Sequence, residues 1–304
     1  MPMTIKHVLA NCLLVSLFLT ACQSNSEQTT ANDSQENLDS IAQTNDSNAV
    51  TEEEVSFNLP SALQIAYVLR KSGVEYDQSL MNNPKNASKY TTTNYKKALN
   101  FGVYSTDLAY CIFNKRFQES KESLKACKEI GSSLGLNQAF ESDNMAQRFD
   151  KNISNEDSVV KIVSSLQLKS DAIFEENKQE HITVLAFTGA WTESLQIAMS
   201  MYGKENEQYT KETGSRKILG NILEQLLMSE TIIRALKSVQ NSETEIPELI
   251  KKIEEINSKT VTISAIEKAM ERDEDVDFST LSVSANELKP INDLVSNLRN
   301  QIIN

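Results

Sequence analysis

The segment 246–256 has the periodicity that most restricts how this chain can fold. Apolar residues recur in it at spacings of three and four: Ile246, Leu249, Ile250, Ile253 and Ile256. This spacing places them on one face of an α-helix. Only 8 glycines and 5 prolines occur in 304 residues, well below the averages of about 7% and 5%. Because strand-rich folds need many turn residues, the sequence predicts an all-α fold, either a multi-helix bundle or an αα-hairpin array.

Two neighbouring helices are predicted at 104–114 and 117–136, joined by a short turn. A shorter helix before them is expected to end at Gly102. Small residues, Ser120 and Cys127 among them, would let the two helices approach closely, in a spacing similar to a degenerate tetratricopeptide hairpin. The full tetratricopeptide period does not recur along the chain. We therefore predict a fold that is tetratricopeptide-like only in part.

Further helices are predicted on both sides of the segment 180–203. This segment is apolar on most faces, which places it at the centre of the core, and Gly203 is expected to end it. Single helices are also predicted over 60–73, 137–152, 154–177, with Ser154 as its cap, and 215–240. The last helix has Ser284 and Glu287 in capping-box positions, and Pro290 predicts a kink or a later start.

The N-terminal 22 residues have the pattern of an export signal. Lys6 precedes an apolar run from Val8 to Phe18, which is too short to span a bilayer but is typical of a cleavable signal. The run ends in Leu19-Thr20-Ala21-Cys22, which is similar to the bacterial lipobox. That similarity implies cleavage before Cys22 and acylation of its thiol, and more than one acyl chain gives a stable membrane anchor. The alternative is an ordinary secreted protein with a chance cysteine after the cut.

The residues after Cys22 favour an outer-membrane location. Gln23, rather than aspartate, follows the cysteine, and this favours the outer membrane. Glu27 is the only acid close to the cysteine, so a domain that faces the periplasm is expected. Residues 23–58 hold eight acidic and no basic residues, a composition that cannot offset its ordering entropy. We therefore predict three parts: a signal peptide at 1–21, a lipidated, disordered acidic tether at 22–58, and an all-helical domain at 59–304.

The charge of the chain limits its partners. The formal net charge is −12, and loss of Lys6 with the signal would make it −13. Such a chain repels nucleic acid and anionic lipid surfaces. We predict no nucleic-acid partner, membrane contact through the acyl chains on Cys22, and a protein partner in the envelope.

Two cysteines remain for the folded domain once Cys12 leaves with the signal and Cys22 is acylated. Cys111 and Cys127 lie on the two neighbouring predicted helices, in a compartment that permits disulfides. A disulfide between them is one alternative. Two buried free thiols that act as small hydrophobes are the other, and we favour it.

Two short motifs of the chain match a sequence pattern that other proteins share. Residues 102–110 fit G-V-Y-x-x-D-L-x-Y, and residues 188–193 fit T-G-x-W-x-E. With the terminal helix after "LSVSANEL", they make the chain from Leu59 onward resemble a family of uncharacterised Bacteroidetes lipoproteins. This resemblance implies a lipobox-anchored, all-helical domain and no particular activity.

The sequence holds no recognisable catalytic motif. His181 is the only histidine after the signal, which excludes two-histidine metal motifs, and we read it as a solvated residue at a helix start. No G-x-G-x-x-G or G-x-x-x-x-G-K-[ST] phosphate-binding loop occurs. We therefore predict no enzymatic activity, no cofactor and no metal.

Two polar-aromatic clusters are the candidate binding residues. Trp191 and Glu193 form the first cluster. They either contact a ligand or take part in proton transfer. The structural alternative is that Trp191 fills the core while Glu193 caps a helix or pairs with a nearby group. Asp107, flanked by Tyr104 and Tyr110 at helical spacing, forms the second, which suits a peptide or a sugar. We favour the structural alternative for both clusters. The predicted function is a lipid-anchored, periplasm-facing helical binding or scaffold module, and the alternative is a receptor for a small molecule or peptide with a pocket near Trp191 and Asp107.

Overall fold

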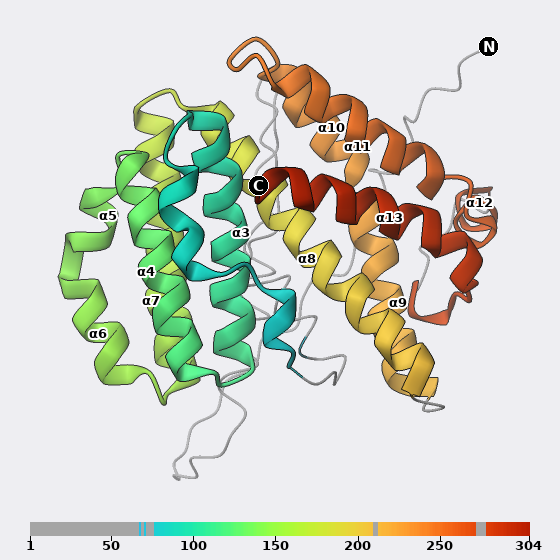
Figure 1. Ribbon diagram of the computed structural model, residues 1–304, viewed down its shortest axis with the longest axis horizontal. Coiled ribbons are helices and arrows are strands. Elements are labelled where there is room, and N and C mark those ends of the chain that lie inside the picture. Colours follow the sequence, from blue (N-terminus) through green and yellow to red (C-terminus); the bar gives the residue numbers. More distant parts are fainter. Residues whose placement is uncertain (1–66, 68–69, 71–75, 209–211, 272–277) are drawn as a thin grey trace, which may run out of the picture.

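The computed structural model describes residues 67, 70, 76–208, 212–271 and 278–304, and over these residues the protein is all-α (Figure 1). Its α-helices are Asn94–Phe113 (α3), Phe117–Ser133 (α4), Asn137–Glu141 (α5), Met145–Asn152 (α6), Glu156–Glu176 (α7), Glu180–Gln208 (α8), Glu212–Leu227 (α9), Ser229–Ser238 (α10), Ile246–Thr260 (α11), Ser264–Glu271 (α12) and Ala285–Ile302 (α13). Short 3₁₀ helices cover Gln78–Leu80 (η1), Pro84–Tyr90 (η2), Ser142–Asn144 (η3) and Phe278–Thr280 (η4).

The predicted signal 1–21 and tether 22–58 lie outside the described residues. Of the predicted helix 60–73, only Tyr67 and Arg70 are described, and both are helical. Among the described helices, none combines the length and the apolar character that a membrane span requires.

Helix α8 is the central element of the fold. Helices α3 to α7 gather on one side of it and α9 to α13 on the other (Figure 1). It packs against α3, α9 and α13. Its buried residues belong to the same core cluster as those of its neighbours, so the prediction that this segment is the centre of the core is confirmed.

The predicted αα-hairpin is formed by α3 and α4. Their turn places Lys115 in the left-handed region at φ 56°, and the Arg116 amide donates to the Cys111 carbonyl over 2.9 Å. The small residues of α4, Ser120 and Cys127 among them, are buried. Small side chains at the contact therefore let α4 lie close to α3, as predicted.

The expectation that a helix ends at Gly102 is wrong, because α3 runs through this residue without a break. A Cβ at Gly102 would lie 1.8 Å from the Ala186 carbonyl oxygen, and a Cβ at Gly189 would lie 1.9 Å from the Leu99 carbonyl oxygen. The two glycines therefore allow the backbones of α3 and α8 to touch, which no larger residue permits. Gly203 also lies within a helix, since α8 continues to Gln208.

Three other predicted helix boundaries differ from the structure. The segment 137–152 divides into α5, η3 and α6, and Asn144 adopts φ 50° at the join. The cap of α7 is Asn155 rather than Ser154, because the Asn155 side chain accepts from the Ser158 amide. The segment 215–240 divides at Met228 into α9 and α10. That division lets α9 pack on α8 while α10 packs mainly on α11.

The last helix begins where the sequence predicts. The Ser284 hydroxyl accepts from the Glu287 amide, and the Glu287 carboxylate accepts from the Ser284 amide over 3.0 Å, which completes the capping box. Pro290 lies inside α13, so it does not delay the helix start. The predicted apolar face of α11 is also confirmed, since all five of its residues are buried.

Candidate functional site

Three charged side chains meet in the interior where α3, α8 and α13 come together. They are Asp107 from α3, Glu193 from α8 and Arg299 from α13. The two acids are fully buried, and the Arg299 side chain is 14% exposed. The close contact at Gly102 and Gly189 fixes the distance between α3 and α8, the helices that carry Asp107 and Glu193. We call these three residues the buried charge cluster.

Arg299 and Glu193 form a two-pronged ion pair. Nε of Arg299 donates to Oε2 of Glu193 over 2.8 Å, and Nη2 donates to Oε1 over 2.7 Å. Nη2 also donates to the Leu80 carbonyl oxygen over 3.1 Å. Paired, charge-assisted bonds of this kind fix geometry as well as charge. Arg299 therefore ties α13 to α8 and to the segment before α3.

Asp107 lies beside this ion pair without a cation of its own. Its Oδ2 accepts from the Asn82 amide over 3.1 Å, and its Oδ1 finds no hydrogen-bond donor among the described residues. Burial, and then the charge of Glu193, raise the pKa of Asp107 well above its usual value. One guanidinium serves two carboxyls here, so the folded protein favours a proton on Asp107, and a protonated Asp107 supplies its own donor to this cluster.

The aromatic candidates are structural anchors. The Tyr104 hydroxyl donates to the Asn83 carbonyl over 2.8 Å, and the Tyr110 hydroxyl accepts from the Asp77 amide over 3.0 Å. Trp191 Nε1 donates to the Gln225 carbonyl over 2.8 Å, so its polar edge turns toward α9 and away from the buried charge cluster. Each of these side chains keeps its polar group bonded to the backbone, as buried tyrosine and tryptophan generally do.

The structure therefore brings together only part of the predicted site. Asp107 and Glu193 interact, while Trp191 bonds to a different helix. All five candidates have an exposed fraction of 1% or less, so they form interior contacts rather than a surface patch. The structural alternative describes them well: Trp191 fills the core, and Glu193 pairs with Arg299, which is distant in sequence rather than nearby.

Sequence reasoning missed Arg299. A signal for it was present, because Arg299 lies four residues after Val295 and three before Ile302, and both of these are buried. An arginine within the apolar stripe of a helix needs a buried partner. The partner itself, Glu193, is not recognisable from the local sequence of α13.

Cys111 and Cys127 are free thiols, and both are buried. The disulfide alternative is therefore not the one in the structure. The Cys111 thiol donates to Met81 Sδ over 3.3 Å. Burial raises the pKa of Cys111 to about 12 and raises that of Cys127 further. Because the thiolate is the reactive species, both act as small apolar side chains.

His181 stands in the first turn of α8, at the helix start that was predicted. Its Nε2 lies 3.9 Å from a carboxylate oxygen of Glu243, and its side chain is about one-fifth exposed, so it is less solvated than expected. Within the described residues, no group of three or more histidine, cysteine or acidic side chains is placed to hold a metal ion.

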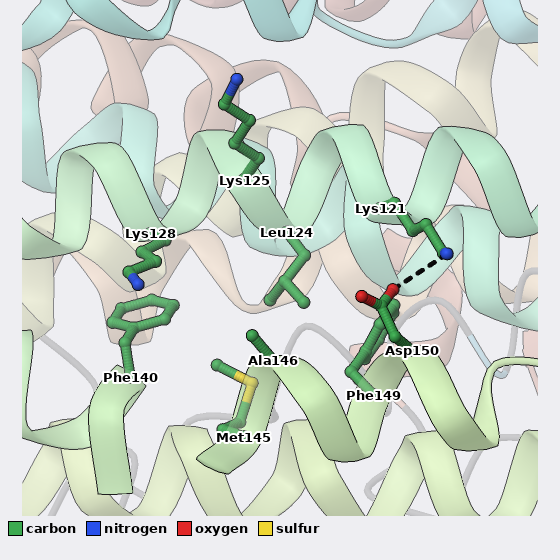
Figure 2. A pocket seen from close by; sticks show the side chains of 9 residues that line it. All are labelled: Lys121, Leu124, Lys125, Lys128, Phe140, Met145, Ala146, Phe149 and Asp150. Atoms are coloured by element: carbon green, nitrogen blue, oxygen red, sulfur yellow. Dashed lines mark ion pairs between the residues drawn. The ribbon is translucent and has the colours of Figure 1, made fainter.

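A groove of about 290 Å³ lies between α4 on one side and α5 and α6 on the other (Figure 2). Its lining consists of apolar residues with charged residues around them: Lys121, Leu124, Lys125, Lys128, Phe140, Met145, Ala146, Phe149 and Asp150. We call it the α4–α6 groove. Sequence reasoning missed it, although lysines at 121, 125 and 128 have the spacing of one helix face.

The comparisons with known proteins leave the function to be argued from this geometry. No protein-family model, curated protein or solved structure was found to match the chain.

Proposed function

We propose that the protein is a lipid-anchored, periplasm-facing helical binding or scaffold module of the bacterial envelope. The observation that carries this proposal is the sequence Leu19-Thr20-Ala21-Cys22 directly after the apolar run 8–18. A thiol at this position is the group that lipoprotein acylation requires, and a multiply acylated chain stays on its membrane. The acidic segment 23–58 would then separate the helical domain from the lipid surface.

The fold supports a binding or scaffold role more than a catalytic one. Three ionisable side chains meet in the described core as the buried charge cluster, and its members are fully enclosed or nearly so. A catalytic acid or base must reach its substrate within hydrogen-bond distance. Neither Asp107 nor Glu193 presents an oxygen to solvent, so the cluster is better suited to holding three segments of the chain together.

Lipidation is tested by metabolic labelling with an alkyne fatty acid in a bacterial host. The full chain should incorporate label, and Cys22→Ser should abolish it. Cys12→Ser is the matched control, because Cys12 lies within the segment that cleavage would remove, and it should label normally. Label that persists in Cys22→Ser would contradict the anchor.

Orientation is tested separately by protease digestion of intact and outer-membrane-permeabilised cells. A periplasm-facing domain should be cut only after permeabilisation. Digestion in intact cells would place the domain at the cell surface instead. Crosslinking of wild-type and Cys22→Ser cells then tests the scaffold role, which predicts a defined crosslinked partner that is lost when the anchor is removed.

A receptor for a small molecule or peptide is the second candidate function. The observation that favours it is the α4–α6 groove, since Trp191 and Asp107 are enclosed. The two candidates differ in what they require. A receptor binds its ligand in solution without the anchor, whereas a scaffold needs its position on the membrane.

A further inference from the structure

The floor of the α4–α6 groove is apolar and is formed by helices on both sides of it. Leu124 extends from α4, while Phe140 comes from α5 and Met145 and Phe149 from α6 (Figure 2). Helix α6 packs mainly on α7 rather than on α4, which leaves this gap between α4 and α6. A methionine in such a wall adapts to the shape of an apolar ligand.

The mouth of the groove is cationic although the protein is acidic. Lys121 forms an ion pair with Asp150 over 2.9 Å and closes one end. Lys128 directs its ammonium toward the groove beside Phe140, whereas Lys125 points away from it (Figure 2). In a chain of net charge −12, an ammonium with an apolar floor below it selects a ligand that is negative at one end only.

We propose that the α4–α6 groove binds a small anionic amphiphile, a medium-chain carboxylate whose alkyl chain lies on the apolar floor and whose head group pairs with Lys128. The volume of about 290 Å³ lies just below the range for small-ligand sites, roughly 300–1,000 Å³. It suits one short chain rather than a helix or a two-chain lipid. The inference rests on the binding role proposed above but not on lipidation, so failure of the labelling experiment would leave it intact.

Isothermal titration with octanoate, decanoate and dodecanoate tests the apolar half of the proposal. The protein is the full chain carrying Cys22→Ser, and every ligand is kept below its critical micelle concentration. Affinity should rise with each added methylene until the groove is filled, by at most about fourfold per methylene, the equivalent of ~0.8 kcal/mol for full burial. An affinity that does not change with chain length would overturn the proposal.

The charged half is tested with single lysine variants. Lys128→Ala should weaken decanoate binding about two- to fivefold, as expected for one exposed ion pair. Lys151→Ala is the control, because Lys151 is exposed on α6 and does not line the groove, and it should bind as the parent does. Equal losses in both variants, or equal affinity for decyltrimethylammonium, would overturn the role of Lys128.

The location is tested by filling the groove. Ala146 is exposed and lines the groove, so Ala146→Trp should abolish binding while circular dichroism stays unchanged. Ala172→Trp, at an exposed position of α7 outside the groove, should bind normally. Undiminished binding by a folded Ala146→Trp would overturn the site. Binding to phosphatidylglycerol vesicles without binding of free carboxylates, or self-association that Ala146→Trp abolishes, would replace the proposed occupant by a lipid surface or a second copy.

Discussion

Arg299 and Glu193 form a two-pronged ion pair in the core although 106 positions separate them in the chain. The pair joins the last helix to the central one, and the same guanidinium also bonds the Leu80 carbonyl. A buried ion pair adds little net stability over an apolar pair, but removing one partner leaves an uncompensated charge. The relationship therefore makes α13 dependent on α8 for its position.

Arg299→Met should destabilise the protein by about 3–5 kcal/mol, because it leaves Glu193 charged or forces it to take up a proton in the interior. Urea unfolding followed by circular dichroism measures the change. Arg299→Lys keeps the charge but not the fork of two donors, so its loss should be smaller. The double variant Glu193→Gln/Arg299→Met should regain part of the stability. A single Arg299→Met variant as stable as the parent would show that the pair does not fix α13.

Asp107 should make stability fall as the pH rises. Its pKa is raised well above the usual value in the folded state, while in the unfolded chain it is about 3.9. The folded state therefore binds the proton more tightly, so the contribution is fully present below about pH 4. It is lost as the pH rises through the folded-state pKa, with a slope of up to about 1.4 kcal/mol per pH unit.

Asp107→Asn is the matched comparison for this pH dependence. The amide keeps the size of the side chain and a donor for the cluster, but it does not titrate. Urea unfolding in steps from pH 4 to pH 8 should give a shallower pH dependence for Asp107→Asn than for the parent. Identical slopes in the two proteins would show that Asp107 carries its charge in the folded state.

Gly189→Ala should destabilise the protein by at least about 2 kcal/mol, in the range of overpacked cores. The new Cβ would lie 1.9 Å from the Leu99 carbonyl oxygen, so α3 and α8 must separate. Gly203→Ala is the control on the same helix, since its Cβ meets nothing within 4 Å. It should stabilise by roughly 0.5–1 kcal/mol through helix propensity. Thermal unfolding of both variants measures the contrast, and a mild Gly189→Ala variant would contradict the close crossing.

Ser284→Ala should raise the pKa of Glu287 and weaken the start of α13. Hydrogen bonds from Ser284, with those from Ser264, lower the pKa of Glu287 to about 2. Carboxyl NMR titration should show this value in the parent and a higher one in the variant. Loss of the cap should cost about 1 kcal/mol. Ser282→Ala, at an exposed position before the cap, is the control and should change neither quantity.

The helical class and several local features could be predicted because they depend on residues close together in the chain. The buried face of α11 repeats every three or four residues, and the α13 capping box needs only Ser284 and Glu287. The α3–α4 hairpin needs two amphipathic segments and a short turn. The interruptions at Gly102 and Gly203 were wrongly predicted because glycine ends a helix or allows a close contact, and only the neighbouring helix decides between them.

The sequence by itself determined that the described chain is helical and which faces of its helices are buried. The tertiary structure alone decided that Asp107 and Glu193 share one arginine, that Trp191 bonds to α9 instead, and that a cationic groove opens between α4 and α6. The physical reason is the range of the interactions. Helix periodicity and capping act within one or two turns, whereas buried ion pairs, glycine contacts and grooves depend on which distant segments the fold brings together.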